Sequence, residues 1–354
     1  MRQASSFELL GKLAQELPRL WFRRRLSPHL WPLVPLSWVF RTVVAARRWL
    51  YAQDLLNSLK LPVPVIIVGN LTVGGSGKTP LTLWVVEHLR TAGYRPGILS
   101  RGYGGEAARI EEVLPESDAA VVGDEPLLLA LRSRVPVFVG RDRVARGSAL
   151  LERHPYCDVL VADDGLQHYR LARCVELAVF DSRGAGNGRL LPAGPLREPL
   201  DRLRTVTGVV CNGGMSDVPE VANEIPCFSM RLSGTRFIAL DDPLHTCVAE
   251  DLKGKKLYAL AGIGDPSRFF SQLASLGLEF SAHPFPDHRR YRAEDLAFAR
   301  DGVLLMTEKD AVKCRGLTLP ETWVLPVDAR IEDNSDGASL LNRILEKLNG
   351  CASA

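Results

Sequence analysis

The sequence predicts an α/β fold: a mostly parallel sheet covered by helices, followed by a second, smaller α/β lobe that two strands join to the first. From residue 63 onward, short apolar runs alternate with segments of helical spacing, a pattern typical of strand–helix repeats. The runs are apolar throughout, which indicates parallel strands covered on both faces. A second block of this kind follows the first, and 354 residues suffice for two domains.

The first block begins with a β-branched run that predicts a strand over Val63–Val68. Apolar residues at helical spacing then predict a helix over Thr79–Ala92. Further buried strands of this block are predicted over Pro96–Leu99, Val137–Val139, Asp158–Ala162, Leu177–Phe180 and Val206–Cys211.

The second block has strand candidates at Leu257–Ala261 and Gly302–Met306, with a helix over Pro266–Leu276 between them. Two stretches, Pro226–Leu232 and Trp323–Val327, predict short strands that cross between the blocks. The chain is therefore expected to have four parts: an N-terminal segment (1–53), a core (54–225), a second lobe with the linker strands (226–330), and a C-terminal part (331–354) whose helix, Gly337–Leu348, returns to the core.

Seven cysteines are scattered along the chain, at positions 157, 174, 211, 227, 247, 314 and 351. None forms a Cys-X-X-Cys pair, and the count is odd. This pattern argues against a disulfide framework or a zinc site and favours a reducing compartment. We expect small buried or incidental residues.

Positive charge is concentrated at the N-terminal end. Residues 1–60 carry ten Lys or Arg and three Asp or Glu, whereas the whole chain has a net charge of +3, so the body is mildly acidic. A basic end on such a body indicates contact with an anionic surface. Nucleic acid is disfavoured as that surface, because the body is not basic.

Residues 17–53 have the composition of a segment that lies in the headgroup layer of a membrane. They include seven arginines, four tryptophans and no acidic residue. The longest run without a charged residue, Leu26–Phe40, has 15 residues and three prolines, fewer than the roughly 20 that a spanning helix needs. Trp and Arg both find partners among headgroups, so we predict an interfacial anchor. An apolar face packed on the protein itself, or a tilted or re-entrant span, are the alternatives.

The most specific motif is a glycine-rich turn between the first predicted strand and helix. Glycines let successive N–H groups face phosphate oxygens, and the helix N-terminus adds positive charge. The motif is a P-loop, which makes the core P-loop NTPase-like, although Thr72 stands where the general pattern has glycine. Lys78 is expected on the β- and γ-phosphates and the Thr79 hydroxyl on Mg²⁺. The predicted nucleotide-binding residues are Thr72, Val73, Gly74, Gly75, Ser76, Gly77, Lys78 and Thr79.

Two carboxylates, Asp163 and Asp164, follow the strand Asp158–Ala162. Strand ends in α/β sheets face the ligand crevice, and adjacent carboxylates repel each other without a cation. We therefore predict a metal or a protonated partner there, with a solvated turn as the alternative. His168 follows four residues later and is either a structural hydrogen bonder or a functional residue.

Three further segments carry candidate groups. Asp124 and Glu125 precede a predicted apolar helix, Leu127–Leu131, and are either partners of its dipole or a base and a metal ligand. Arg141 follows a predicted strand, and a guanidinium there can neutralise charge on a transferring phosphoryl group. The segment Gly186–Glu198, rich in glycine and proline, is typical of a functional loop. The segment Pro286–Tyr291 is either functional or simply exposed.

Together these segments resemble the lipid A 4'-kinases, the tetraacyldisaccharide 4'-kinases of Gram-negative bacteria. The resemblance covers about residues 19 to 345. The shared blocks, in the same order, are Gly69–Pro80, Ser100–Gly105, Gly123–Pro126, Asp163–His168, Gly194–Glu198, Asp287–His288 and Thr307–Asp310.

The resemblance implies transfer of the γ-phosphate of ATP, with Mg²⁺, to the 4'-hydroxyl of a tetraacylated disaccharide 1-phosphate, the lipid A precursor. The product would be lipid IVA, in lipopolysaccharide biosynthesis. The enzyme is expected at the cytoplasmic face of the inner membrane, with lipids contacting residues 17–53. No nucleic acid or obligate protein partner is expected.

The resemblance also implies roles for single residues. Asp124 is the expected base, aided by His288 from the second lobe, with Lys78 and Arg141 as further catalytic residues. The expected metal ligands are Thr79, Glu125, Asp163 and Asp164. The expected substrate-binding residues are Asn70, His168, Arg197 and Glu198.

Two other classes of function remain as alternatives. One is a P-loop kinase for a soluble small molecule. The other is a membrane-associated nucleotide switch, but its base-reading motif would be Asn-Lys-X-Asp, and the nearest match, Thr307–Asp310, has its lysine one position too late.

A sugar hydroxyl is a poor nucleophile, so a carboxylate that accepts its proton contributes about 10²–10⁴-fold to the rate. A base from the second lobe predicts lobe closure on the substrate.

Overall fold

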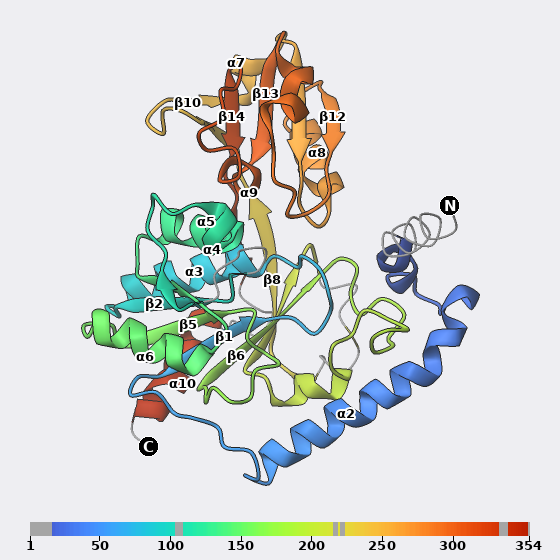
Figure 1. Ribbon diagram of the computed structural model, residues 1–354, viewed down its shortest axis with the longest axis vertical. Coiled ribbons are helices and arrows are strands. Elements are labelled where there is room, and N and C mark those ends of the chain that lie inside the picture. Colours follow the sequence, from blue (N-terminus) through green and yellow to red (C-terminus); the bar gives the residue numbers. More distant parts are fainter. Residues whose placement is uncertain (1–15, 103–108, 215–218, 220–223, 333–338, 353–354) are drawn as a thin grey trace. The chain divides into compact units, whose positions relative to one another are not determined.

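The structure is a computed structural model that describes residues 16–102, 109–214, 219, 224–332 and 339–352 (Figure 1). The chain divides into two compact units. Unit 1 comprises the described residues up to 78, with 164–231 and from 331 onward, and unit 2 comprises 79–163 and 232–330. The predicted four-part division stays a prediction. Residues 1–15, 103–105 and 337–338, on which parts of the predictions fall, lie outside the described residues.

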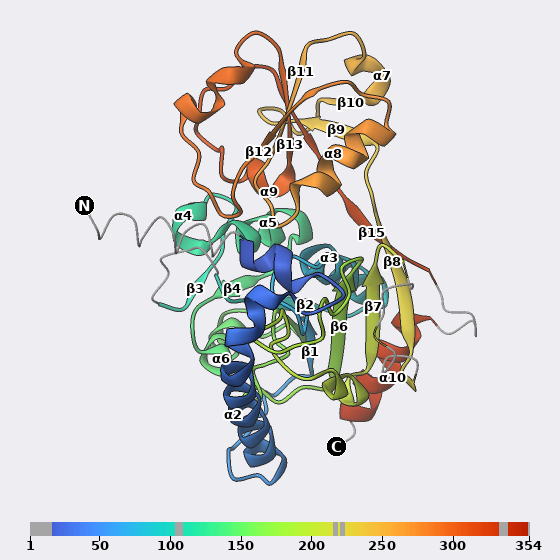
Figure 2. The same ribbon diagram turned by 90° about the vertical axis from the view of Figure 1, so that its right-hand side faces the viewer.

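Unit 1 contains a run of parallel strands in the order β8-β7-β6-β1 (Figure 2). Every residue of β1 and β7 is buried, as expected for apolar parallel strands covered on both faces. The register pairs Ile66 with Val175 and Phe180 with Cys211. The strand bounds are β1 Val65–Gly69, β6 Val175–Asp181, β7 Gly208–Asn212 and β8 Cys227–Ser233.

The two longest helices of unit 1, α2 and α10, lie towards the two ends of the chain. Helix α10 packs against β6 through Leu340, Ile344 and Leu348, which recur every four residues and are buried. Helix α2, in contrast, buries only Ser37. None of the helices in the described part of the chain is long and apolar enough to cross a bilayer. The bounds are η1 Pro28–Leu33, α2 Val34–Ala52, η2 Leu200–Thr205 and α10 Leu340–Ala352.

Unit 2 contains a second strand run, in the order β5-β2-β4-β3, in which only β3 is antiparallel to its neighbour. The strands are β2 Pro96–Ser100, β3 Glu111–Glu112, β4 Val137–Val139 and β5 Val159–Asp163. The helices in this part of the chain are α3 Lys78–Thr91, α4 Ala119–Val122, α5 Asp124–Ser133 and α6 Arg143–Arg153.

Unit 2 also contains a six-stranded sheet in the order β10-β9-β14-β13-β11-β12. Its strands alternate sides: Leu257 and Ala259 of β11 lie in one apolar cluster, and Tyr258 and Leu260 in another. The strands are β9 Arg236–Ala239, β10 Thr246–Val248, β11 Leu257–Ala261, β12 Ser281–Pro284, β13 Val303–Thr307 and β14 Thr322–Leu325. The helices are α7 Ala249–Leu252, α8 Pro266–Ser275, η4 Ala293–Ala299 and α9 Glu308–Ala311.

The α/β class and the linker of two strands are confirmed, but one linker strand was predicted in the wrong place. Two of the four passages of the chain between the units lie within β8 and within β15 (Asp328–Glu332), which are sheet neighbours, and the other two follow Lys78 and Asp163. The stretch Trp323–Val327 instead contributes β14, inside the six-stranded sheet. All four residues of β14 are buried, whereas β15 is mostly exposed. The high apolar content of Trp323–Val327 therefore reflects a strand inside the six-stranded sheet and not a linker strand.

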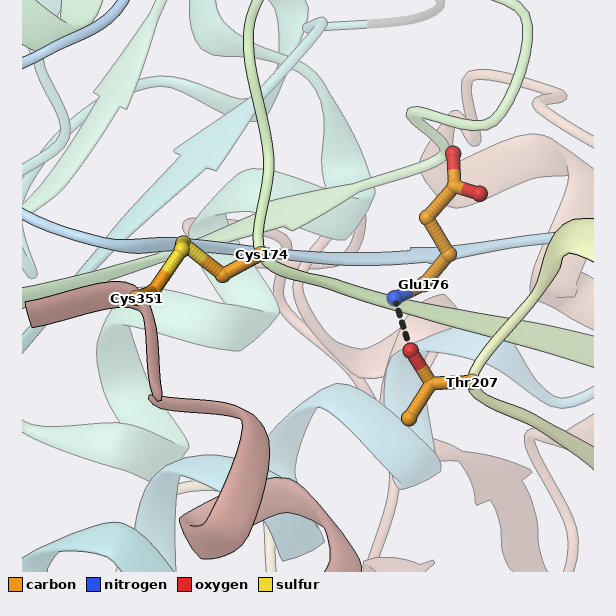
Figure 3. Close-up of a disulfide and its surroundings, with 4 residues drawn as sticks. All are labelled: Cys174, Glu176, Thr207 and Cys351. Atoms are coloured by element: carbon orange, nitrogen blue, oxygen red, sulfur yellow. Dashed lines mark hydrogen bonds between the residues drawn. A yellow bond between two sulfur atoms is a disulfide. The ribbon is translucent and has the colours of Figure 1, made fainter. Parts of the chain in front are cut away.

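A disulfide joins Cys174, just before β6, to Cys351 in the last turn of α10 (Figure 3). The expectation of buried or incidental cysteines is wrong for this pair. The two cysteines lie 177 residues apart, so no local pattern in the sequence reveals the contact. Beside it, the N–H of Glu176 donates to the Thr207 hydroxyl at 3.0 Å. Of the other five cysteines, Cys157, Cys211 and Cys314 are buried.

Candidate active site

The glycine-rich turn lies between β1 and α3, as predicted. Gly74 and Gly77 have φ values of +97° and +95°, which residues with a Cβ rarely adopt. A Cβ at Gly77 would lie 2.5 Å from Nδ2 of Asn212. That amide, at the end of β7, donates to the carbonyl of Ser76 at 3.2 Å. The last residue of β7 therefore helps to fix the backbone conformation of the turn.

Side chains hold three successive carbonyls of this turn. Asn70 donates to the carbonyl of Gly74 at 3.2 Å, and Arg183 to that of Gly75 at 2.9 Å, in addition to the Asn212 bond to Ser76. In a trans peptide the N–H points opposite to the C=O. The N–H groups of Gly75, Ser76 and Gly77 therefore point away from these side chains, as a phosphate cradle requires.

The turn also contains a buried hydroxyl. Ser76 is 1% exposed, and within the described part of the chain its Oγ has no hydrogen-bond partner. A buried polar atom that lacks a partner costs free energy. An oxygen-rich anion in the cradle would satisfy it. Thr72, the departure from the general pattern, forms an antiparallel bridge with Leu196 of the Gly186–Glu198 loop.

Lys78, Asp164 and Arg197 form the first charged cluster, in unit 1. The Asp164 carboxylate lies 3.8 Å from Nζ of Lys78 and 3.1 Å from Nη1 of Arg197. Asp164 has a left-handed backbone, with φ of +52°. The backbone N–H of Arg197 donates to the carbonyl of Leu71 at 2.7 Å, which fixes its loop to the chain just before the turn. Two cations and one carboxylate thus gather beside the turn.

Asp163 ends β5 and is buried. Its carboxylate accepts a hydrogen bond of 3.4 Å from the hydroxyl of Thr82, in the first turns of α3. Its backbone carbonyl lies 3.5 Å from a donor nitrogen of Arg143. Both carboxylates at the end of β5 therefore have partners: Thr82 for Asp163, and the cations of the first cluster for Asp164.

Asp124 and His288 form the centre of a second charged cluster, in unit 2. Asp124 is the first residue of α5 and is 5% exposed. Nδ1 of His288 lies 3.1 and 3.2 Å from its two carboxylate oxygens, and the N–H of Glu125 donates to it at 2.9 Å. His288 has φ of +59°, in the segment after β12. The structure thus brings together the predicted base and its predicted helper.

Lys309 of α9 joins this cluster. Its Nζ lies 3.0 Å from Glu125, 3.0 Å from Asp287 and 3.8 Å from Asp124. Next to it, Glu308 accepts from Arg132 of α5, which fastens the two helices together. The Lys309 ammonium therefore lies among three carboxylates, and the ion pair between Glu308 and Arg132 holds its helix against α5.

The charges of this cluster shift its pKa values. Burial would raise the pKa of Asp124, but the hydrogen bond with His288 and the charge of Lys309 outweigh it and hold that pKa below its ordinary value. The hydrogen bond to Asp124 raises the pKa of His288 despite burial. Burial lowers the pKa of Lys309, but Glu125, Asp124 and Asp287 more than offset this, so it lies above its ordinary value. The cluster therefore favours an ionised carboxylate beside two cations.

Oxygen donors suitable for Mg²⁺ are present. Carboxylate and hydroxyl oxygens are the ligands this ion prefers. Thr79 directly follows Lys78, the first residue of α3 after the turn, and the Asp164 carboxylate lies 3.8 Å from Nζ of that lysine. Asp124, Asp287 and His288 place ligand atoms within 4.8 Å of one another. However, Lys309 already supplies positive charge to two of these three. The chemistry therefore fits a cation beside the P-loop better than one at Asp124.

The remaining predicted residues differ in surroundings. Asn70 is fully buried, and its Oδ1 is another buried atom for which the described residues provide no partner. Glu198 is 2% exposed and bonded to Tyr169 and Gln167. His168 is half-buried, and Arg141 is exposed in the segment between β4 and α6. Their predicted roles are not distinguished by these contacts.

Three residues at these clusters had no predicted role: Lys309, Asn212 and Arg183. Each follows the end of a buried parallel strand or lies at its last residue, namely β13, β7 and β6. Their position at carboxyl ends of strands was the available signal. Lys309 belongs to a block that was recognised in the sequence but read only as a poor match to a base-reading motif.

The family model for tetraacyldisaccharide-1-P 4'-kinase matches residues 29–346. The chain belongs to the tetraacyldisaccharide-1-P 4'-kinase family. It is therefore a kinase, which confirms the resemblance and the enzyme class predicted from the sequence.

Relatives in this 4'-kinase family match nearly the whole chain. The tetraacyldisaccharide 4'-kinase of Dechloromonas aromatica is 54% identical over 340 residues, covering 96% of this chain and 98% of the relative. That of an Azoarcus species is 51% identical over 333 residues, covering 94% and 95%. A crystal structure of LpxK from Aquifex aeolicus, titled as an "apo" form in complex with ATP, matches with a TM-score of 0.77 and 31% identity. It covers 90% of this chain and 98% of that one.

Proposed function

We propose that this kinase transfers the γ-phosphate of ATP to the 4'-hydroxyl of tetraacyldisaccharide 1-phosphate, giving lipid IVA in lipid A biosynthesis. The names of the relatives supply the acceptor, and the ATP in the Aquifex aeolicus structure supplies the donor. The observation that carries the proposal is the cradle with its buried Ser76 hydroxyl, together with the ionised Asp124 held by His288.

The phosphates of ATP would bind the N–H groups of Gly75, Ser76 and Gly77. Lys78 would leave its 3.8 Å pairing with Asp164 and bind the β- and γ-phosphate oxygens. Arg197, and by the resemblance Arg141, would neutralise charge that develops on the transferring group. When bound, Mg²⁺ would be held by Thr79, Asp163, Asp164 and, by the resemblance, Glu125, and would neutralise further phosphate charge.

Asp124 would accept the proton of the 4'-hydroxyl. A carboxylate whose pKa lies below its ordinary value is ionised near pH 7. It is a weak base, so its benefit comes from position: His288 and the N–H of Glu125 fix the direction of its lone pairs. By the resemblance, Asn70, His168 and Glu198 would contact the acceptor. The lobe closure predicted from the sequence stays a prediction.

We further propose that residues 17–53, which include α2, lie in the headgroup layer at the cytoplasmic face of the inner membrane, where ATP is available. Trp38 and Trp49 are 60% and 57% exposed, and Val39 and Val43 are also exposed. Arginines are interspersed among them. Exposed tryptophan and arginine on one helix suit the interface of an anionic bilayer.

The deciding experiment is transfer of labelled γ-phosphate from ATP to tetraacyldisaccharide 1-phosphate in detergent micelles. We expect transfer by the wild type and a kcat lower by about 10²–10⁴-fold in Asp124→Asn. Asp301→Asn, at an exposed ion pair with Lys256, is the matched control and should retain full activity. Hydrolysis of ATP by the wild type without a phosphorylated lipid would refute the proposal and favour a nucleotide switch.

A further inference from the structure

A cavity in unit 1 opens between α2 and the Gly186–Glu198 loop. Its volume is about 220 Å³, and we call it the α2 groove. Its walls include Ser37, Trp38 and Arg41 of α2, Arg189 and Leu196 of the loop, and Asp201 of η2. Neither arginine has a role in the nucleotide or base clusters described above.

The loop that forms one wall of the groove is anchored at both ends. On the α2 side, the Ser37 hydroxyl donates to the carbonyl of Leu190 at 2.8 Å, and Nε1 of Trp21 donates to Pro192 at 2.9 Å. On the P-loop side, the N–H of Val73 donates to Pro195 at 2.9 Å. One loop thus connects the proposed membrane helix with the phosphate cradle, and the groove is a fixed part of that connection.

The groove carries positive charge that no other described side chain neutralises. Arg41 and Arg189 are both exposed, and neither guanidinium group has an ion pair or a hydrogen bond with any residue in the described ranges. Other arginines of unit 1, such as Arg183 and Arg202, are paired with carboxylates. Two guanidinium groups against the single carboxylate of Asp201 leave the groove with a net positive charge.

The chemistry and size of the groove fit a sugar phosphate. Arginine presents paired donors that match phosphate oxygens, a carboxylate accepts from hydroxyl groups, and the rings of Trp38 offer apolar area. At about 220 Å³ the groove is smaller than the pockets of roughly 300–1,000 Å³ that enclose whole drug-sized ligands. It therefore suits one anionic end of a larger molecule.

We propose that the α2 groove binds the 1-phosphate of the glycolipid acceptor through Arg41 and Arg189. The inference rests on the proposed function, in which the acceptor carries a phosphate monoester at one end and the reacting hydroxyl on its other sugar. Binding of the anionic end beside α2 leaves the acyl chains next to the apolar residues of that helix. The phosphate of an anionic membrane lipid shares this chemistry, and the experiment separates the two.

The experiment compares two acceptors: tetraacyldisaccharide 1-phosphate and the same disaccharide with a free 1-hydroxyl. The variants are Arg41→Gln/Arg189→Gln and, as a matched control on the same helix but outside the groove, Arg48→Gln. We expect the double variant to lose about 10- to 100-fold in kcat/KM for the phosphorylated acceptor, mainly through KM. Its kcat/KM for the 1-hydroxyl acceptor and its KM for ATP should stay within about twofold of the wild type. Arg189→Lys should lose part of the effect, because lysine keeps the charge but not the paired donors.

An equal loss for both acceptors would overturn the inference. A loss that appears only in micelles containing phosphatidylglycerol, and equally for both acceptors, would assign the groove to a membrane lipid instead. Binding of the two acceptors to the wild type and the double variant is measured separately, by calorimetry in micelles. If the wild type transfers phosphate to neither acceptor, the proposed function fails. The groove is still supported in that case if the wild type binds the 1-phosphate acceptor more tightly than the 1-hydroxyl acceptor and the double variant does not. Equal binding of both acceptors to the wild type refutes it.

Discussion

Lys309→Met removes the ammonium from among three carboxylates. In the wild type, Nζ lies 3.0 Å from Glu125 and Asp287 and 3.8 Å from Asp124, and the side chain is only 14% exposed. Methionine keeps much of the apolar stem but not the charge. We expect the variant to be less stable at pH 7, because the acidic groups then face one another with His288 as their nearest remaining cation.

The stability lost in Lys309→Met is limited by the free energy of protonating one of the carboxylates. Removing one partner of a buried ion pair costs about 3–5 kcal/mol. A carboxylate can escape this cost by taking up a proton, which requires about 4 kcal/mol at pH 7 and about 1.4 kcal/mol at pH 5 for a group with a pKa near 4. The variant's carboxylate pKa is raised relative to the unfolded chain, so its stability falls as pH rises. We therefore expect a loss of about 3–4 kcal/mol at pH 7 and about 1–2 kcal/mol at pH 5.

Urea unfolding followed by circular dichroism at both pH values measures these losses. Lys255→Met is the matched control, because its pair with Glu321 is 43% and 48% exposed; it should cost under about 1 kcal/mol at either pH. A loss for Lys309→Met that is equal at pH 5 and pH 7 would refute the reasoning. So would a loss no larger than that of the control.

The remaining predictions concern three other features. His288→Phe should destabilise more at pH 6 than at pH 9 in thermal unfolding, because the raised pKa of His288 gives stability that is lost as pH rises through it; equal effects would contradict this. Gly77→Ala should cost about 1–3 kcal/mol in the absence of nucleotide, because of its φ and the nearby Asn212, whereas Gly75→Ala, with nothing within 4 Å of the added Cβ, should be nearly neutral. Trp38→Ser/Trp49→Ser should weaken flotation with phosphatidylglycerol vesicles several-fold; unchanged flotation would show that α2 is not the contact.

Local patterns in the sequence predicted the parts of the site that depend on local structure. The P-loop lies between one strand and the next helix, so its position followed from about fifteen residues. The acidic end of β5 was recognisable for the same reason. The contact between Asp124 and His288 spans 164 residues; it was expected only from the family resemblance, because no periodicity in the chain relates the two.

Features that depend on packing could not be predicted in this way. Lys309 gains its importance from three carboxylates on two other segments, and its own sequence neighbourhood shows only a polar run after a strand. The α2 groove arises where a helix meets a loop about 150 residues away, as the bond between Ser37 and Leu190 illustrates. The apolar stretch at Trp323 was correctly recognised as a strand, but its burial on both faces, which decides between sheet interior and linker, is a tertiary property.

The disulfide between Cys174 and Cys351 has a consequence for the covalent topology of the chain. It closes a ring that contains both β8 and β15, and therefore the whole stretch 232–330 that these strands connect to unit 1. A single cut of the backbone between these cysteines cannot release either fragment while the bond persists. On a denaturing gel, the oxidised protein after limited proteolysis should thus give fragments that migrate as separate bands only after reduction, whereas the same cut in the reduced protein gives separate bands directly.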